Sequence, residues 1–290
     1  MKPEQRPAIL GLALQLTLVT LWMSVEPLLA ADDDSTPLRS KLDFRDAVRP
    51  SPSTKMPEAI RDSYWHGQFQ RVNREVSKAK QARVVFFGDS MTWRWSLGKA
   101  EGKFVWQERF GKYNPINMGN SGDITPVMLY RVTHGNLDFA KGQEPAVAVL
   151  LCGTNNYVVN QSAGGKVKWN LGMETSPKEV ADGVRAVAQV FRRRLPATRV
   201  IMLGILPVRN KAKWMKCQET NRINAGYNYP DGEVTFLDLE DHFVKSDGSL
   251  KSELFVDGTH LTTKGYEVLA DAIDPVIERL IEAGRIPPAQ

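Results

Sequence analysis

The chain has 290 residues, of which 42% are hydrophobic and 24% charged, proportions typical of a globular protein with a substantial core. They exclude a disordered chain and a small disulfide scaffold. The net charge of +5 comes from dispersed groups such as "FRRRL" and "RNKAKWMK", which predict solvated surfaces. No basic module with interleaved aromatic residues is present, so we expect no nucleic-acid partner. Composition leaves the oligomeric state open.

Residues 1–30 have the layout of a secretory signal peptide. Lys2 and Arg6 precede an apolar run from Ala8 to Met23, and small residues follow near Ala30. We therefore expect export, to a secreted or periplasmic location. The alternative is an uncleaved N-terminal membrane anchor, although the run is shorter than the roughly 20 residues of a spanning helix. Residues 31–55 are rich in proline, serine and charge, and predict an extended lead-in to a main domain at 56–290.

The main domain begins with a helical pattern in which Ile60, Tyr64, Val72 and Val76 share one face. Several of the apolar runs that follow lack alternation, as expected for strands covered by helices on both faces. These runs span 83–88, 115–119, 146–153, 199–207 and 234–239. Residues 176–195 and 263–284 predict long helices, the second with Pro275 as a point where it can bend. The alternation predicts one α/β domain with a doubly wound parallel sheet.

Polar groups that follow the strands are the candidates for a site, because ligands of such sheets bind beyond the carboxyl ends of the strands. The first group is Gly88-Asp89-Ser90. In isolation its serine is more simply a helix cap than a nucleophile. The other groups are "NMGNSG" at 117–122, "GTNN" at 153–156 and "DGTHLT" at 257–262. The two glycines of "NMGNSG" allow backbone N–H groups to face a ligand.

Asp257 and His260 form the most informative pair. A general-base histidine needs a carboxylate that orients its ring and stabilises its cation, and a three-residue spacing on one turn can supply both. The sequence has four histidines, and the other three are more simply structural or surface residues: His66, His134 and His242. The pair therefore predicts acid–base chemistry at the last strand exit.

Together, these polar groups at the ends of the strands supply every part of a serine esterase. Ser90 would attack the acyl carbon, His260 would take and return the proton, and Asp257 would hold the histidine tautomer. The predicted oxyanion donors are the N–H of Ser90, the N–H of Gly119 and the side-chain amide of Asn155. This chemistry needs neither a cofactor nor a metal.

The four blocks resemble those of the SGNH hydrolases, the GDSL-type esterase and lipase family. They stand in the family's order, with Ser90 in "GDS", Gly119 in "NMGNSG", Asn155 in "GTNN" and His260 in "DGTHLT". Within this family, these blocks most resemble those of the platelet-activating-factor acetylhydrolase catalytic subunits and their bacterial relatives. The resemblance implies a flavodoxin-like, three-layer α/β/α sandwich that hydrolyses small acyl esters without a cofactor.

We expect a short-chain acyl esterase, acetyl esters first, acting on an acetylated carbohydrate or another small ester. The alternatives are a phospholipid-type acyl-lipid esterase and a catalytically silent glycan-binding module on the same fold. Three residues are candidates for lining the substrate: Trp93, Asn156, and Trp169 in the loop 157–176. Of Trp93 and Trp95, one is expected in the core and the other at the site. Cys152 is expected in the core, and a bridge to Cys217 stays open.

Overall fold

The computed structural model describes residues 63–98, 101–157, 175–229 and 232–284. The predicted signal segment, the lead-in and most of the loop 157–176, Trp169 included, lie outside these residues. The described elements are α1 (Ser63–Lys78), β1 (Val84–Gly88), α2 (Ser90–Ser96), α3 (Lys103–Val105), η4 (Trp106–Phe110), η5 (Gly111–Tyr113), β2 (Ile116–Gly119), α4 (Thr125–Thr133), β3 (Val147–Leu151), η6 (Thr154–Tyr157), α5 (Pro177–Arg194), β4 (Arg199–Leu203), α6 (Lys211–Ala225), β5 (Val234–Leu237), α7 (Glu240–Phe243), η7 (Ser252–Leu254) and α8 (Thr263–Ala283).

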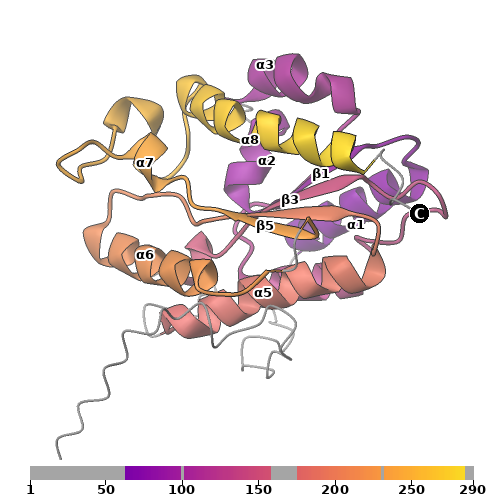
Figure 1. The fold of residues 1–290 in the computed structure, drawn as a ribbon, viewed down its shortest axis with the longest axis horizontal. Coiled ribbons are helices and arrows are strands. Elements are labelled where there is room, and N and C mark those ends of the chain that lie inside the picture. Colours follow the sequence, from indigo (N-terminus) through magenta and orange to yellow (C-terminus); the bar gives the residue numbers. More distant parts are fainter. Residues whose placement is uncertain (1–62, 99–100, 158–174, 230–231, 285–290) are drawn as a thin grey trace, which may run out of the picture. The chain divides into compact units, whose positions relative to one another are not determined.

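The five predicted strands all form and build one sheet (Figure 1). They pair in parallel in the order β2-β1-β3-β4-β5. This order is that of a flavodoxin-like, doubly wound sheet. The register places Gly88 of β1 beside Gly119 of β2 and Leu151 of β3, so these three strands end level with one another. The predicted fold class is confirmed, and the segments that leave these strands lie along one edge of the sheet.

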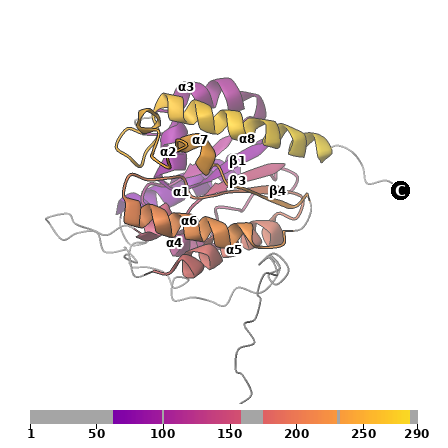
Figure 2. The same cartoon turned by 60° about the vertical axis from the view of Figure 1, so that its left-hand side comes forward.

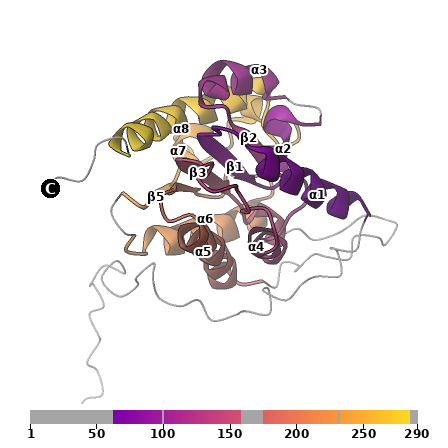
Figure 3. The same cartoon turned by 90° about the vertical axis from the view of Figure 1, so that its right-hand side faces the viewer.

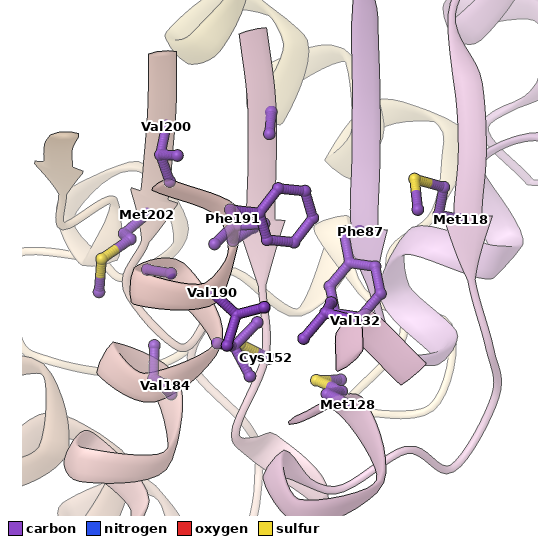
Figure 4. Close-up of a cluster of buried hydrophobic side chains, with 14 of the residues drawn as sticks. Phe87, Met118, Met128, Val132, Cys152, Val184, Val190, Phe191, Val200 and Met202 are labelled. Carbon is purple, nitrogen blue, oxygen red and sulfur yellow. The ribbon is translucent and has the colours of Figure 1, made fainter. Parts of the chain in front are cut away.

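Helices cover both faces of the sheet, which is why the strands are apolar along their length. Helices α2, α3 and α8 lie on one face, and α4, α5 and α6 lie on the other (Figures 2 and 3). Phe87 of β1 packs edge-on against Phe191 of α5, with ring centroids 5.4 Å apart, in the core between the sheet and α4 and α5 (Figure 4). On the opposite face, Phe86 packs against Trp95, which confirms a core position for that tryptophan.

The predicted face of the first helix is partly wrong. Val72 and Val76 of α1 are buried as expected, but Tyr64 is 52% exposed, and Ile60 lies outside the described residues. Trp65 and Phe69 take the buried positions instead and pack against α4. One residue along a helix is a turn of about 100°, so the buried stripe passes through Trp65 and leaves Tyr64 facing solvent.

The last helix, α8, runs from Thr263 to Ala283 as one element that contains Pro275. Cys152 and Cys217 are both buried free thiols. Among the described residues, no helix combines the length and the apolar character needed to cross a membrane.

Candidate active site

Ser90 lies at a sharp turn between β1 and α2. Asp89 caps the helix, because its Oδ1 accepts the N–H of Met91 at 2.9 Å, and Ser90 is the first helical residue. Gly88 is required just before it, since a Cβ there would collide with the carbonyl oxygen of Leu151 and the side chain of Thr92. The turn thus holds the serine hydroxyl at the carboxyl edge of the sheet. The cap interpretation of Ser90 is therefore wrong, because Asp89 is the cap and the serine hydroxyl is left for chemistry.

Ser90, His260 and Asp257 form a row of hydrogen bonds. Oγ of Ser90 lies 2.9 Å from Nε2 of His260, and Nδ1 of His260 lies 2.7 Å from Oδ2 of Asp257. A carboxylate beside Nδ1 fixes the proton on that nitrogen, so that Nε2 accepts the serine hydroxyl. The structure therefore brings together the three predicted catalytic residues in the geometry of a nucleophile, its base and the group that orients the base.

The turn that carries Asp257 and His260 also fixes the charge state of Asp257. Oδ1 of Asp257 accepts the N–H groups of Thr259 and His260, at 3.0 and 2.9 Å. Partial burial raises the pKa of Asp257, but the backbone N–H and the ring of His260 outweigh this effect and bring the pKa down to about 2. Asp257 is therefore an anion at neutral pH, as its orienting role requires. The other three histidines are exposed, away from this row: His66, His134 and His242.

Asn155 reaches the site from the end of β3. It lies in the short helix η6, and its Nδ2 donates to the carbonyl oxygen of Asp123 at 3.0 Å. A carboxamide has two N–H donors, so this contact orients the group and leaves the second donor for a ligand. The neighbouring Asn156 is buried, and its side chain bonds both the backbone N–H and the hydroxyl of Thr125. Asn156 therefore acts as a brace between η6 and α4.

The structure contradicts Gly119 as an oxyanion donor. Its N–H donates to Oδ1 of Asn117 at 2.9 Å, and its Cα faces the backbone of Trp93 in α2 without room for a Cβ. Gly122, three residues on, is exposed and has a φ of +86°, with open space around its Cα. Its N–H makes no hydrogen bond within the part of the chain described. The sequence offered both glycines, and Gly122 is the one whose N–H can meet a ligand.

A buried ion pair holds the loop between β2 and α4, and sequence reasoning missed it. Arg131 of α4 donates to Oδ2 of Asp123, to the carbonyl oxygen of Met118 and, at 2.8 Å, to Oδ1 of Asn136. Both charged side chains are fully buried. Oδ1 of Asp123 also accepts the indole N–H of Trp65 at 2.8 Å. Because the carbonyl of Asp123 orients Asn155, this ion pair positions a candidate oxyanion donor.

Trp93, a predicted substrate contact, lies away from Ser90. Trp93 is half-buried, and its ring lies so close to Gly98 that a Cβ there would collide with it, at the far end of α2 from Ser90. Trp169 lies outside the described residues. The described residues contain no group of three or more His, Cys, Asp or Glu side chains placed to hold a metal.

Comparisons with known proteins identify the family of the chain. The sequence model of the GDSL-like Lipase/Acylhydrolase family matches residues 86–268. The chain is 30% identical over 224 residues to platelet-activating factor acetylhydrolase IB subunit alpha2 of Homo sapiens, covering 76% of this chain and 86% of that protein. It is 27% identical over 239 residues to the alpha1 subunit of Bos taurus, covering 80% and 91%. Among solved structures, a GDSL-like lipase from Bacteroides thetaiotaomicron, 20% identical, shares the fold with a TM-score of 0.54 over 75% of this chain and 98% of that one.

Proposed function

Because the chain belongs to the GDSL-like lipase/acylhydrolase family and is a carboxylic ester hydrolase, we propose that it cleaves short-chain acyl esters with Ser90 as nucleophile. The observation that carries the proposal is the row from Ser90 through His260 to Asp257, with contacts of 2.9 and 2.7 Å. A catalytically silent binding module has no need of such a row.

The proposed reaction has two halves. In the first, Nε2 of His260 takes the proton of Ser90 as Oγ attacks the acyl carbon, and the tetrahedral intermediate then collapses as His260 gives that proton to the leaving alcohol. In the second, a water molecule loses its proton to His260 and attacks the acyl-enzyme. The acid product leaves, and the proton returns to Ser90. Asp257 stays ionised throughout and stabilises the imidazolium that forms in each half.

Three donors would stabilise the oxyanion in both halves. The N–H of Ser90 is in the first turn of α2 and has no acceptor within its own helix. The N–H of Gly122 and the second amide hydrogen of Asn155 complete the set. One such donor typically contributes about 3 to 4 kcal/mol to the stabilisation of a transition state. The carboxamide at Asn155 suits this task because a carboxylate there would repel the oxyanion.

The acyl group in this proposal is acetyl. Support comes from the name of the two relatives, platelet-activating factor acetylhydrolase. That name also favours a phospholipid-type ester as the second candidate for the substrate. A carbohydrate ester is the first candidate because residues 1–30 predict export, to a secreted or periplasmic location or to the membrane as an anchored protein.

The test is hydrolysis of p-nitrophenyl acetate by the wild type and by Ser90→Ala. We expect the variant to lose at least about a thousandfold in kcat, because no other group can form the acyl-enzyme. Ser77→Ala is the matched control, since Ser77 is an exposed serine of α1 that bonds only the carbonyl of Arg74 within the described chain. Equal rates for wild type and Ser90→Ala would refute the proposal. The rates of hydrolysis of acetylated sugars, acetylated xylan and phospholipid esters then show which alcohol part of the substrate the enzyme prefers.

A further inference from the structure

A small, largely buried cavity borders the turns that carry Ser90, Asn155 and His260. Its volume is about 10 Å³, and its walls include Asp89, Thr154 and Thr259. Each of these residues immediately precedes a residue of the proposed machinery: Ser90, Asn155 and His260. The remaining wall is apolar and includes Leu151 and Ile205. All three turns therefore border this one small cavity.

Two of the residues that line this cavity each have a polar side-chain atom without a partner. Oδ2 of Asp89 and Oγ1 of Thr154 are buried, and neither makes a hydrogen bond to any residue that the structure describes. The two residues are 1% and 6% exposed. Buried carboxyl and hydroxyl oxygens are almost always hydrogen-bonded, to protein or to ordered water, because leaving them unpaired is costly. A cavity with such atoms in its wall differs from an apolar one, which stays dry.

We propose that this cavity holds one ordered water molecule, bonded to Asp89 Oδ2 and Thr154 Oγ1, which ties the nucleophile turn to the oxyanion turn. A buried water molecule needs a cavity of about 10 to 15 Å³ and at least two polar partners. This cavity, at about 10 Å³, reaches the lower end of that range, and the two unpartnered oxygens supply the partners. Thr259 brings the turn of the catalytic histidine to the same space. Asp89 and Thr154 are then positioning residues, which act on Ser90 and Asn155 through the water.

The chemistry of Asp89 suits a water partner better than a fixed donor. Burial raises the pKa of Asp89 to about 7, so the carboxyl exists in both forms near neutral pH. A water molecule donates to the carboxylate and accepts from the carboxylic acid, so it satisfies Oδ2 in either form. The charged and titratable groups around Asp89 come from four segments: Lys213 of α6, Asp123 before α4, Cys152 after β3, and Tyr266 of α8.

The direct test is a crystal structure of the wild-type protein at a resolution that shows ordered water. We expect a water peak within hydrogen-bond distance of both Asp89 Oδ2 and Thr154 Oγ1, and its loss or displacement in Thr154→Val. A wild-type map without that peak, or with a water that contacts only one of the two atoms, would overturn the proposal. This result does not depend on esterase activity.

The kinetic test rests on the proposed function and uses p-nitrophenyl acetate. In Thr154→Val we expect kcat to fall about fivefold to tenfold with little change in KM, the effect of one lost hydrogen bond on positioning. Thr154→Ser keeps the hydroxyl and should recover the wild-type rate. Thr198→Val is the control, because it removes a buried threonine bond to the carbonyl of Pro145 at the opposite end of the sheet and should leave kcat unchanged. A wild-type kcat in Thr154→Val refutes the positioning role. A wild type inactive on every ester tested refutes the proposed function instead, while the map still decides on the water.

Discussion

The pKa values of two carboxyl groups near Ser90, those of Asp257 and Asp89, are shifted in opposite directions by their surroundings. Asp257 lies partly in solvent and accepts two backbone N–H groups, and its pKa falls to about 2. Ionised Asp257 therefore stabilises the folded protein above its unfolded pKa near 3.8, and this contribution is lost as the pH falls through 2. Asp89 is buried, and its pKa rises to about 7 because desolvation opposes its charge. The exposed carboxyl suits the orientation of a cation, and the buried one suits a structural cap.

Asp89 gives a pH dependence of stability that can be measured. Its folded pKa lies above its unfolded value of 3.8, so between pH 4 and 7 the folded protein holds a proton that the unfolded chain releases. As the pH rises through this range, we expect the free energy of unfolding of the wild type to fall, relative to that of Asp89→Asn, by up to about 1.4 kcal/mol per pH unit. Denaturant unfolding across the range measures the difference. Asp247→Asn, a change at a fully exposed aspartate, should track the wild type, and parallel curves for wild type and Asp89→Asn would contradict the expectation.

Asn155 is the oxyanion donor whose removal is simplest to interpret. Asn155→Ala deletes the amide that the carbonyl of Asp123 orients and leaves the row of Ser90, His260 and Asp257 in place. We expect kcat for p-nitrophenyl acetate to fall about 10² to 10³-fold with KM nearly unchanged, because the lost contact exists only in the transition state. An equal fall with an unfolding temperature far below that of the wild type would instead indicate a structural role.

At the scale of elements, the loop between β2 and α4 depends on the ion pair of Arg131 and Asp123. Each of the three guanidinium nitrogens donates one hydrogen bond, to Asp123 in this loop, to the carbonyl oxygen of Met118 in β2 and to Asn136 after α4. Both charged side chains are fully buried. Removal of one partner from such a pair leaves an uncompensated buried charge. Removal of either charge alone therefore destabilises this loop.

Arg131→Met tests this dependence. We expect a loss of about 3 to 5 kcal/mol in the free energy of unfolding, measured with denaturant, because Asp123 stays buried without its partner. The double variant Arg131→Met with Asp123→Asn removes both charges and should recover part of the loss. Arg74→Met, at an exposed arginine of α1, should stay within about 0.5 kcal/mol of the wild type. A double variant no more stable than Arg131→Met would argue against the charge as the cause.

The sequence was sufficient for the elements that depend on local pattern. Continuous apolar runs predicted the five strands within a few residues, and the fixed direction of a parallel sheet predicted that their polar exits would meet. Asp257 and His260 were predictable because one turn carries both. Tyr64 was misplaced because one residue of helical phase separates it from Trp65, and the packing of α1 against α4 decides the phase.

The remaining parts of the site depend on contacts between distant segments. Gly119 and Gly122 look alike in "NMGNSG", and only the packing of Gly119 against α2 and its bond to Asn117 exclude it as a donor. The role of Arg131 requires its contact with Asp123, and the cavity requires three separate turns around one space. No residue spacing in the sequence encodes these relations, so the structure was needed for them.

At the scale of the whole molecule, one parallel sheet places the segments that follow its strands along one edge. The strand order β2-β1-β3-β4-β5 sets Ser90 after a central strand, between the exits of β2 and β3 that carry Gly122 and Asn155. The last turn before α8 then brings Asp257 and His260 to the same edge, with Nε2 at 2.9 Å from the serine hydroxyl. The fold thus assembles residues from four separate segments around a single hydroxyl.

The most direct measurement of the central claim is covalent labelling by a fluorophosphonate, which reacts with an activated serine and does not leave. We predict one label per chain, located by peptide mass spectrometry on Ser90, with loss of p-nitrophenyl acetate hydrolysis in proportion to labelling. Ser90→Ala and His260→Ala should remain unlabelled, the first for want of a nucleophile and the second for want of its base. A label on another residue, or full activity in the fully labelled protein, would contradict the assignment of Ser90 as the nucleophile.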